Sequence, residues 1–224
     1  HLKLDLLFAE KGITANPDQR FRIFLTNSLE PHHPDTGNLF STWLAQESNE
    51  ANYIKRDTPV MIVVGNPPYN ISGCDKGEWI RGLISDYKKD LKEKKVPLDD
   101  DYIKFIRYAQ FLVERTGNGI VAYVTNNSFM DGITHRQMRK CLISAFDRIY
   151  ILNLHGDTKK KETSPGESKD KNVFDIRQGV AIVIFVRTAS RNLKKAKLNP
   201  EIKYFDLWGS RQIKYEFLDH KSIE

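Results

Sequence analysis

Residues 60–69 read Val60-Met61-Ile62-Val63-Val64-Gly65-Asn66-Pro67-Pro68-Tyr69, an apolar run that leads directly into a proline-rich tetrapeptide. The run is short and rich in β-branched residues, which predicts a buried β-strand over residues 60–64. Two consecutive prolines cannot continue a strand, because each lacks a backbone N–H and has a fixed φ. The polar groups of residues 66–69 are therefore expected at the carboxyl end of this strand.

Similar apolar runs recur along the chain and alternate with segments of helical period. Further strands are predicted at residues 21–26, 119–124, 148–152 and 179–187, and helices at residues 39–55, 101–115 and 134–146. This alternation predicts an α/β fold with a mostly parallel sheet. In open α/β sheets, ligands bind beyond the carboxyl ends of the strands, which is where the tetrapeptide is predicted to lie.

Composition narrows the class of protein. The chain has 224 residues, 40% of them hydrophobic, which suffices for one large domain or for one domain with an annex. Two cysteines exclude a disulfide scaffold and favour a reducing, cytoplasmic setting. The apolar run at residues 180–186 is far shorter than the ~20 residues that span a bilayer, so no membrane partner is expected. The net charge of +6 is a mild bias toward polyanions that ordinary surface charge also explains.

Three stretches depart from the strand and helix pattern. Residues 72–100 and 158–172 carry many charges without apolar periodicity and are predicted to be surface insertions. After residue 188 the chain becomes rich in Lys and Arg, which predicts a linker, followed by a closing hairpin or annex at residues 202–218. The chain also starts inside an amphipathic pattern without an initiator Met, from which we expect an excerpt of a longer polypeptide.

The tetrapeptide is suited to binding a planar amino group. Such a nitrogen is a poor nucleophile because its lone pair is delocalised, and two acceptors for its N–H groups favour the pyramidal form. The side-chain oxygen of Asn66 can accept one hydrogen bond and the Pro67 carbonyl the other, while Pro68 stiffens the backbone. Tyr69 offers a ring face on which a base can stack. By chance this tetrapeptide appears in only about one chain per thousand of this length, so a plain turn with Tyr69 in the core is the weaker interpretation.

These residues resemble the catalytic motif of amino-group DNA methyltransferases, specifically the adenine-N6 enzymes that flip the target base out of the helix. The resemblance covers nearly the whole chain and extends to the methylase region of Type IIG and Type ISP restriction-modification enzymes. The segments that carry it, besides the tetrapeptide, are residues 1–4, 25–30, 49–60, 124–132, 138–140 and 172–174. It implies a Rossmann-like class I methyltransferase core, a mostly parallel sheet with an antiparallel strand near the C-terminal end.

The resemblance also implies roles for single residues. Asn66 and Pro67 would bind the adenine amino group and Tyr69 would stack on the flipped base. Phe174 matches the second aromatic residue of the family, which stacks on the other face of the base, although a hydrophobic plug before a strand is an alternative. Phe105 lies where related enzymes contact the cofactor adenine, and packing in a helix core explains it equally well. No metal ligands are predicted.

The cofactor of this family is S-adenosylmethionine (AdoMet), and here the sequence departs from the pattern. Related enzymes bind AdoMet with a glycine-rich turn before the catalytic motif. The glycines before Asn66 are Gly12, Gly37 and Gly65, and none lies in that pattern. We therefore expect the N-terminal part of the fold to be missing, with residues 1–188 a partial catalytic domain and residues 189–224 a linker and annex toward a target-recognition region.

The resemblance implies double-stranded DNA as the partner, with nuclease and target-recognition regions elsewhere in the parent polypeptide. Two alternatives stay open. One is a methyltransferase for the glutamine amide of a protein, since that planar amide needs the same two acceptors. The other is a catalytically silent DNA-binding module. A smaller ambiguity concerns Arg136, Arg139 and Lys140, a basic cluster that contacts either phosphates or only solvent.

Overall fold

The computed structural model describes residues 2–13, 22–32, 42–69, 76–93, 97–160, 162, 164–165, 170–188 and 200–220. The chain divides into two compact units, His1–Thr58 and Pro59–Glu224. Among the described helices, none combines the length and the apolar character that a membrane span needs.

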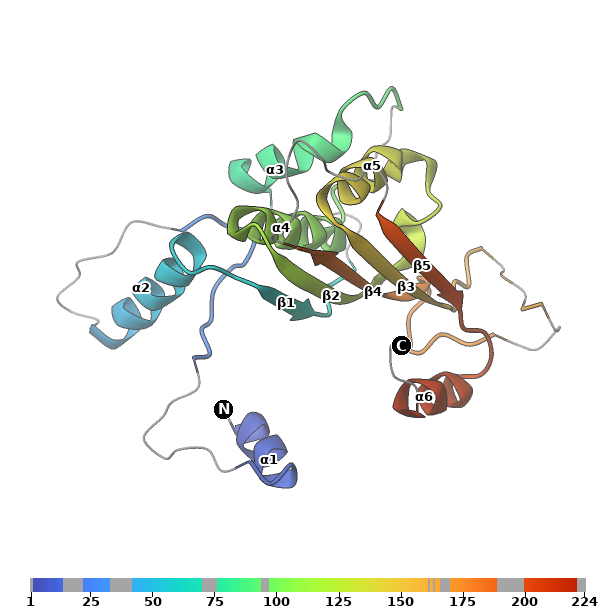
Figure 1. Ribbon diagram of the computed structural model, residues 1–224, viewed down its shortest axis with the longest axis horizontal. Helices are drawn as coiled ribbons and strands as arrows, with labels where there is room; N and C mark the ends of the chain where they lie inside the picture. The colour runs from blue at the N-terminus through green and yellow to red at the C-terminus, as the bar shows by residue number, and fades with distance from the viewer. Residues whose placement is uncertain are drawn as a thin grey trace. The chain divides into compact units, whose positions relative to one another are not determined.

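The first unit contains helices α1 (Leu2–Glu10) and α2 (Thr42–Arg56), which are blue to cyan in Figure 1. Helix α2 matches the predicted helix at residues 39–55, of which residues 39–41 lie outside the described residues. The strand predicted at residues 21–26 is wrong: residues 22–26 are irregular, and Leu25 is 98% exposed. Apolar β-formers make a strand only where a neighbouring strand supplies hydrogen bonds, and the described residues of this unit supply none.

The second unit is built on a five-stranded sheet in the order β1-β2-β4-β3-β5. Its strands are β1 (Ile62–Gly65), β2 (Gly119–Asn126), β3 (Arg148–His155), β4 (Val180–Arg187) and β5 (Glu201–Asp206). β1 pairs with β2 in parallel and β3 pairs with β5 in parallel, whereas β4 runs antiparallel to both β2 and β3. The α/β fold is thus confirmed, with a mixed sheet in which four strands share one direction.

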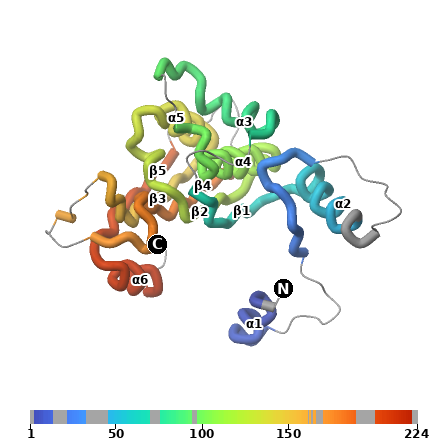
Figure 2. The backbone as a smooth tube through the Cα atoms, turned by 180° about the vertical axis from the view of Figure 1, so that it is seen from behind, coloured from blue at the N-terminus to red at the C-terminus, as the bar shows by residue number. Residues whose placement is uncertain are grey.

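Three helices of this unit, α3 (Glu78–Lys88), α4 (Asp101–Thr116) and α5 (Arg136–Ala145), lie together beside the sheet (Figures 1 and 2). Helix α4 begins after Asp100, whose side chain accepts a hydrogen bond from the Tyr102 N–H. It ends at Gly117, a C-cap with a φ of +88° that donates its N–H to the Val113 carbonyl. Two aromatic rings, Phe146 and Phe185, stack in the core at 5.1 Å.

Two of the unpatterned stretches contain regular structure. Residues 78–88, inside the predicted insertion, form α3, which buries Ile80, Ile84 and Tyr87. Of the two alternatives predicted for residues 202–218, a closing hairpin or an annex, the hairpin is wrong. The segment instead forms β5, which joins the main sheet beside β3, and α6 (Arg211–His220), which lies beyond the carboxyl end of β5 (Figure 1). Within residues 158–172, the described part holds neither helix nor strand.

Candidate active site at the carboxyl edge of the sheet

The polar segments singled out in the sequence meet at one edge of the sheet. Since β1, β2, β3 and β5 run in one direction, their carboxyl ends share an edge, and β4 begins there because Val180 pairs with Asn126. Residues 66–69 leave this edge after β1, and residues 172–174 arrive at it before β4. The topology therefore brings the tetrapeptide and the Phe174 region, about a hundred residues apart in sequence, to the same edge.

The tetrapeptide presents Asn66 at the surface. Asn66 and Pro68 are exposed, whereas Pro67 between them is buried and Tyr69 is half-buried. The Tyr69 hydroxyl donates a hydrogen bond to Asn66 Oδ1 at 3.4 Å. An amide oxygen has two lone pairs, so Asn66 Oδ1 keeps one acceptor position for a ligand. The strand end thus holds an accessible amide oxygen in a defined orientation.

Tyr69 packs onto a hydrophobic cluster made by residues of β3 and β4 and of the segments before β4 and after β5. The buried members of this cluster are Leu154, Val173, Val180 and Leu207. Burial raises the pKa of Tyr69 to about 12, so the phenol stays neutral and keeps its proton for Asn66. Because Val173 precedes Phe174, the cluster links the tetrapeptide to the second predicted aromatic residue.

A second aromatic residue, Tyr102, packs against the Tyr69 ring. The ring of Tyr102, on α4, meets Tyr69 edge-on with centroids 6.4 Å apart and an angle of 86°. Tyr102 is buried, and its hydroxyl lies 3.4 Å from His135 Nε2. Burial, with a smaller contribution from the Arg139 charge, lowers the pKa of His135 to about 4, so the imidazole is neutral at pH 7.

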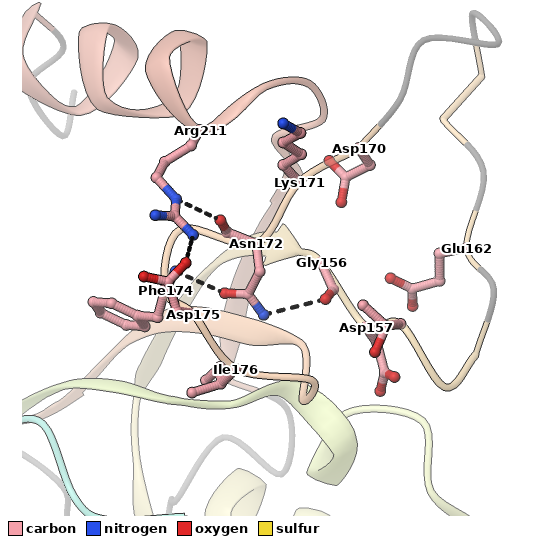
Figure 3. Close-up of a pocket in the computed structure, with 11 residues that line it drawn as sticks. Gly156, Asp157, Glu162, Asp170, Lys171, Asn172, Phe174, Asp175, Ile176 and Arg211 are labelled. Atoms are coloured by element: carbon pink, nitrogen blue, oxygen red, sulfur yellow. Dashed lines mark hydrogen bonds and ion pairs between the residues drawn. The ribbon is translucent and has the colours of Figure 1, made fainter.

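Phe174 sits at the margin of a pocket of about 410 Å³ (Figure 3). Its side chain is 36% exposed, and its backbone N–H donates to Asn172 Oδ1 at 2.9 Å. Asn172, Ile176 and Arg211 line the same pocket, with the carboxylates of Asp157, Asp170, Asp175 and Glu162. The exposed ring is free to meet a planar ligand, and its role in base stacking stays a prediction.

Phe105 lies on α4, one turn after Tyr102, and is half-buried. Residues three apart on a helix are neighbours on its surface, so Phe105 lies next to Tyr102 on α4. Its predicted contact with a cofactor adenine stays a prediction.

Sequence reasoning missed a polar network at the ends of β3 and β5. Asn127 Nδ2 donates to Asn153 Oδ1 at 3.1 Å, and His155 Nε2 lies 2.7 Å from Asp206 Oδ1. The His155 ring stacks on Trp208 at 3.3 Å. The sequence did contain an indication of this network, because β3 and β5 both end in polar residues. Buried polar side chains need hydrogen-bond partners, so these residues were expected to bond to one another.

The basic cluster on α5 is used within the protein. Arg139 donates to the carbonyls of Phe129 and Gly132 at 2.9 and 2.8 Å, and Arg136 forms an ion pair with Glu93. Arg136 and Lys140 are exposed, whereas Arg139 is half-buried. The structure therefore favours an internal role for both arginines over phosphate binding.

Comparison with protein families identifies the chain. The model of the Eco57I restriction-modification methylase family matches residues 6–159, more than half of the sequence. The chain belongs to this family. The Eco57I-type match runs from the middle of α1 past the end of β3, and therefore includes the tetrapeptide and Tyr102.

Solved structures show the same fold. The Type ISP restriction-modification enzyme LlaBIII, solved bound to DNA, is similar over 96% of this chain with a TM-score of 0.75 and 24% identity. A complex of DrdV with DNA is similar over 99% of the chain, with a TM-score of 0.74 and 29% identity. The Type ISP enzyme LlaGI, with a DNA substrate mimic, is similar over 84%, with a TM-score of 0.65 and 23% identity.

The Eco57I-type chain spans only a small part of these structures, 14% of LlaBIII, 21% of DrdV and 16% of LlaGI. Among curated proteins, none matches the sequence.

Proposed function

We propose that this chain is the base-binding part of a DNA adenine-N6 methyltransferase that belongs to a restriction-modification enzyme. The observation that carries the proposal is the position of Asn66 to Tyr69 at the carboxyl end of β1, with an exposed amide oxygen beside an aromatic ring. Membership of the Eco57I methylase family supports the same reaction class.

The chemistry follows from the acceptors of the tetrapeptide. Asn66 Oδ1 and the Pro67 carbonyl accept hydrogen bonds from the two N–H groups of the adenine N6, which favours a pyramidal nitrogen with an available lone pair. Tyr69 stacks on one face of the flipped base, and Phe174 stacks on the other. The methylated nitrogen is briefly cationic and releases its proton readily, so no carboxylate base is needed.

AdoMet would supply the methyl group as an electrophile. The described residues fit one side of this chemistry, because the Asn66 side-chain oxygen is an acceptor for the N–H groups of a nucleophilic amine, and Asn66 is exposed. For the adenine of AdoMet we propose a contact with Phe105. The glycine-rich turn that holds AdoMet in related enzymes is not found in residues 1–224.

The proposed partner is double-stranded DNA, in a cytoplasmic setting. The structures of LlaBIII, DrdV and LlaGI were determined with DNA or a DNA mimic, which supports this partner. We propose that nuclease and target-recognition regions belong to other parts of the parent enzyme, since the chain spans 14–21% of LlaBIII, DrdV and LlaGI.

The test replaces Asn66 by Ala in the full-length enzyme and follows transfer of a labelled methyl group from AdoMet to DNA. Loss of a preorganised acceptor is expected to slow transfer by about 100- to 1000-fold. DNA affinity is expected to stay within about twofold, because binding to the DNA backbone does not involve this amide. Asn118→Ala is the matched control. Asn118 directly precedes β2, so it lies at the amino ends of the parallel strands, away from Asn66 at their carboxyl ends.

Methyl transfer at the wild-type rate in Asn66→Ala would contradict the proposed role of Asn66 in catalysis. The two alternatives are separated in the same assay. Transfer to a glutamine-containing peptide and not to DNA would indicate a protein methyltransferase. An enzyme that binds DNA tightly but transfers no methyl group would indicate a silent binding module.

A further inference from the structure

Helix α6 holds the backbone of the segment that carries Phe174, which we define as residues 170–178. The carbonyls of three successive residues in this segment each accept a hydrogen bond from an α6 side chain. They are Lys171 from Lys214 Nζ at 2.7 Å, Asn172 from Arg211 Nε at 3.0 Å and Val173 from Tyr215 Oη at 2.7 Å. The three donors are spaced i, i+3 and i+4, which places them on one face of the helix.

Helix α6 is itself fixed to the sheet. Phe217 stacks on Phe205 of β5 with ring centroids 5.6 Å apart. Lys214 is fully buried, and its Nζ also donates to the Leu154 carbonyl at the end of β3. The same ammonium pairs with the buried carboxylate of Asp170 at 2.7 Å. The three donors therefore start from a rigid support.

The side chain of Asn172 ties the Phe174 segment from the other side. Its Nδ2 donates to the Gly156 carbonyl at 3.1 Å and its Oδ1 accepts from the Phe174 N–H (Figure 3). The same Nδ2 also donates to the Gln178 carbonyl at 2.7 Å. Gly156 has a φ of +84°, and a Cβ there would lie 2.5 Å from Asn172 Cα. This close approach admits only glycine, so the backbone around Asn172 has little freedom.

The ring of Phe174 is exposed and lies in a segment without helix or strand. Its own packing is thus insufficient to set its position, whereas the backbone on either side is held at several points. A loop held by donors from a packed helix loses much of the entropy that would otherwise be paid when a ligand binds.

We propose that α6 is a positioning element for the target base, in which Arg211 and Tyr215, together with Asn172, hold residues 170–178 so that Phe174 stacks on the flipped adenine. The proposal rests on the function proposed above. Arg211 and Tyr215 are positioning residues, since each acts through the backbone of the Phe174 segment.

The experiment removes single donors in the full-length enzyme. Tyr215→Phe keeps the ring and loses the hydroxyl, and Arg211→Met keeps the aliphatic stem and loses the guanidinium. Tyr215→Phe is expected to slow single-turnover methyl transfer by about fivefold, as loss of one hydrogen bond implies. Arg211→Met is expected to slow it at least as much, because the guanidinium also pairs with Asp175 in the same segment at 2.6 Å. The dissociation constants for DNA and AdoMet are expected to be unchanged in both variants. Gln212→Ala is the control, because Gln212 is exposed and, among the residues that the structure describes, its side chain bonds to Glu216 of the same helix. Lys214 is left intact, since its loss would strand the buried Asp170 charge.

The decisive readout is a double-mutant cycle with Phe174→Ala. If the donors act through Phe174, the slowing by Tyr215→Phe disappears in the Phe174→Ala background. An undiminished, additive effect would show a general structural role and overturn the proposal. A wild-type enzyme that transfers no methyl group to DNA would overturn the proposed function as well.

A second measurement does not depend on activity. Hydrogen exchange of the amides of residues 173–178 is expected to be about fivefold faster in Tyr215→Phe and unchanged in Gln212→Ala. Equal exchange in wild type and Tyr215→Phe would show that α6 does not hold the segment, even where methylation by the wild type supports the proposed function.

Discussion

Asn66 and Tyr69 form a pair whose internal hydrogen bond bears on ligand binding. At 3.4 Å the bond from the Tyr69 hydroxyl to Asn66 Oδ1 is long, and it is therefore weak. A ligand amino group can share that oxygen or displace the phenol at low cost. The pair thus orients the amide before binding without competing strongly for it.

His135, which contacts Tyr102, is expected to make the free energy of unfolding depend on pH. Its pKa is lowered from 6.5 to about 4, chiefly by burial. Between these values the unfolded chain binds a proton that the folded chain does not, so stability is complete above about pH 6.5 and decreases as the pH falls toward 4. We expect the free energy of unfolding, measured by urea denaturation, to decrease from pH 7 to pH 4.5.

Replacement of His135 by Gln is expected to flatten this pH dependence. The exposed His220 on α6 provides the control, and His220→Gln is expected to leave the dependence unchanged. Parallel curves for wild type and His135→Gln would contradict the assignment of the effect to His135.

Helix α3 shows why an element can be missed. Its buried residues Ile80, Ile84 and Tyr87 follow a helical period, but lysines cluster at and beyond its end and the composition of the wider stretch suggested a loop. Polar contacts then attach it to α4. Arg107 donates to the Leu83 carbonyl at 3.1 Å and pairs with Asp86 at the same distance.

The hydroxyl of Tyr87 is expected to be a main contribution to this attachment. It donates to Gln110 Oε1 at 2.6 Å, and the Tyr87 side chain is fully buried. Tyr87→Phe leaves the amide oxygen without its partner, which is expected to lower the free energy of unfolding by about 1–3 kcal/mol. Chemical denaturation measures the change. Tyr150→Phe, half-buried on β3, is the control and is expected to change stability by less than about 0.5 kcal/mol.

At the scale of the second unit, the sheet has an open edge at β1. Within the described residues β1 pairs only with β2, and Ile62 and Val64 are 65% and 74% exposed. Apolar side chains of this kind normally pack against a further layer or strand. The exposed β1 side chains therefore offer a surface for a further strand or layer, which the function proposed above assigns to the cofactor-binding part.

The isolated chain is therefore expected to bind AdoMet weakly or not at all. Without a glycine-rich turn, its dissociation constant in titration calorimetry is expected to exceed about 1 mM, which corresponds to less than about 4 kcal/mol of binding free energy. The full-length enzyme serves as the positive control. Micromolar binding by residues 1–224 alone would disprove the argument from the missing turn.

Local sequence determined much of the second unit. The strands predicted at residues 119–124, 148–152 and 179–187 are largely buried, and β-branched apolar runs of that length have few other ways to be buried. The strand predicted at residues 60–64 forms as β1 (Ile62–Gly65), but its predicted burial is wrong, because within the described residues β1 is an edge strand. The place of Asn66 to Tyr69 at a strand end was predictable too, because two prolines stop the ladder. Composition alone was misleading at residues 22–26. They have a strand-like composition but are irregular, because a strand requires a neighbouring strand for its hydrogen bonds.

Tertiary structure decided which distant segments meet. No local pattern states that β4 inserts between β2 and β3, or that residues 202–206 join the same sheet, because register and order depend on packing over the whole domain. Two contacts depend on that strand order. One is the edge-on contact of Tyr69 with Tyr102, and the other is the hydrogen bonding of α6 to the Phe174 segment. The sequence by itself determined the chemical groups of the site and the strand that ends in them. Long-range packing determined their neighbours, because each contact joins residues that no local interaction brings together.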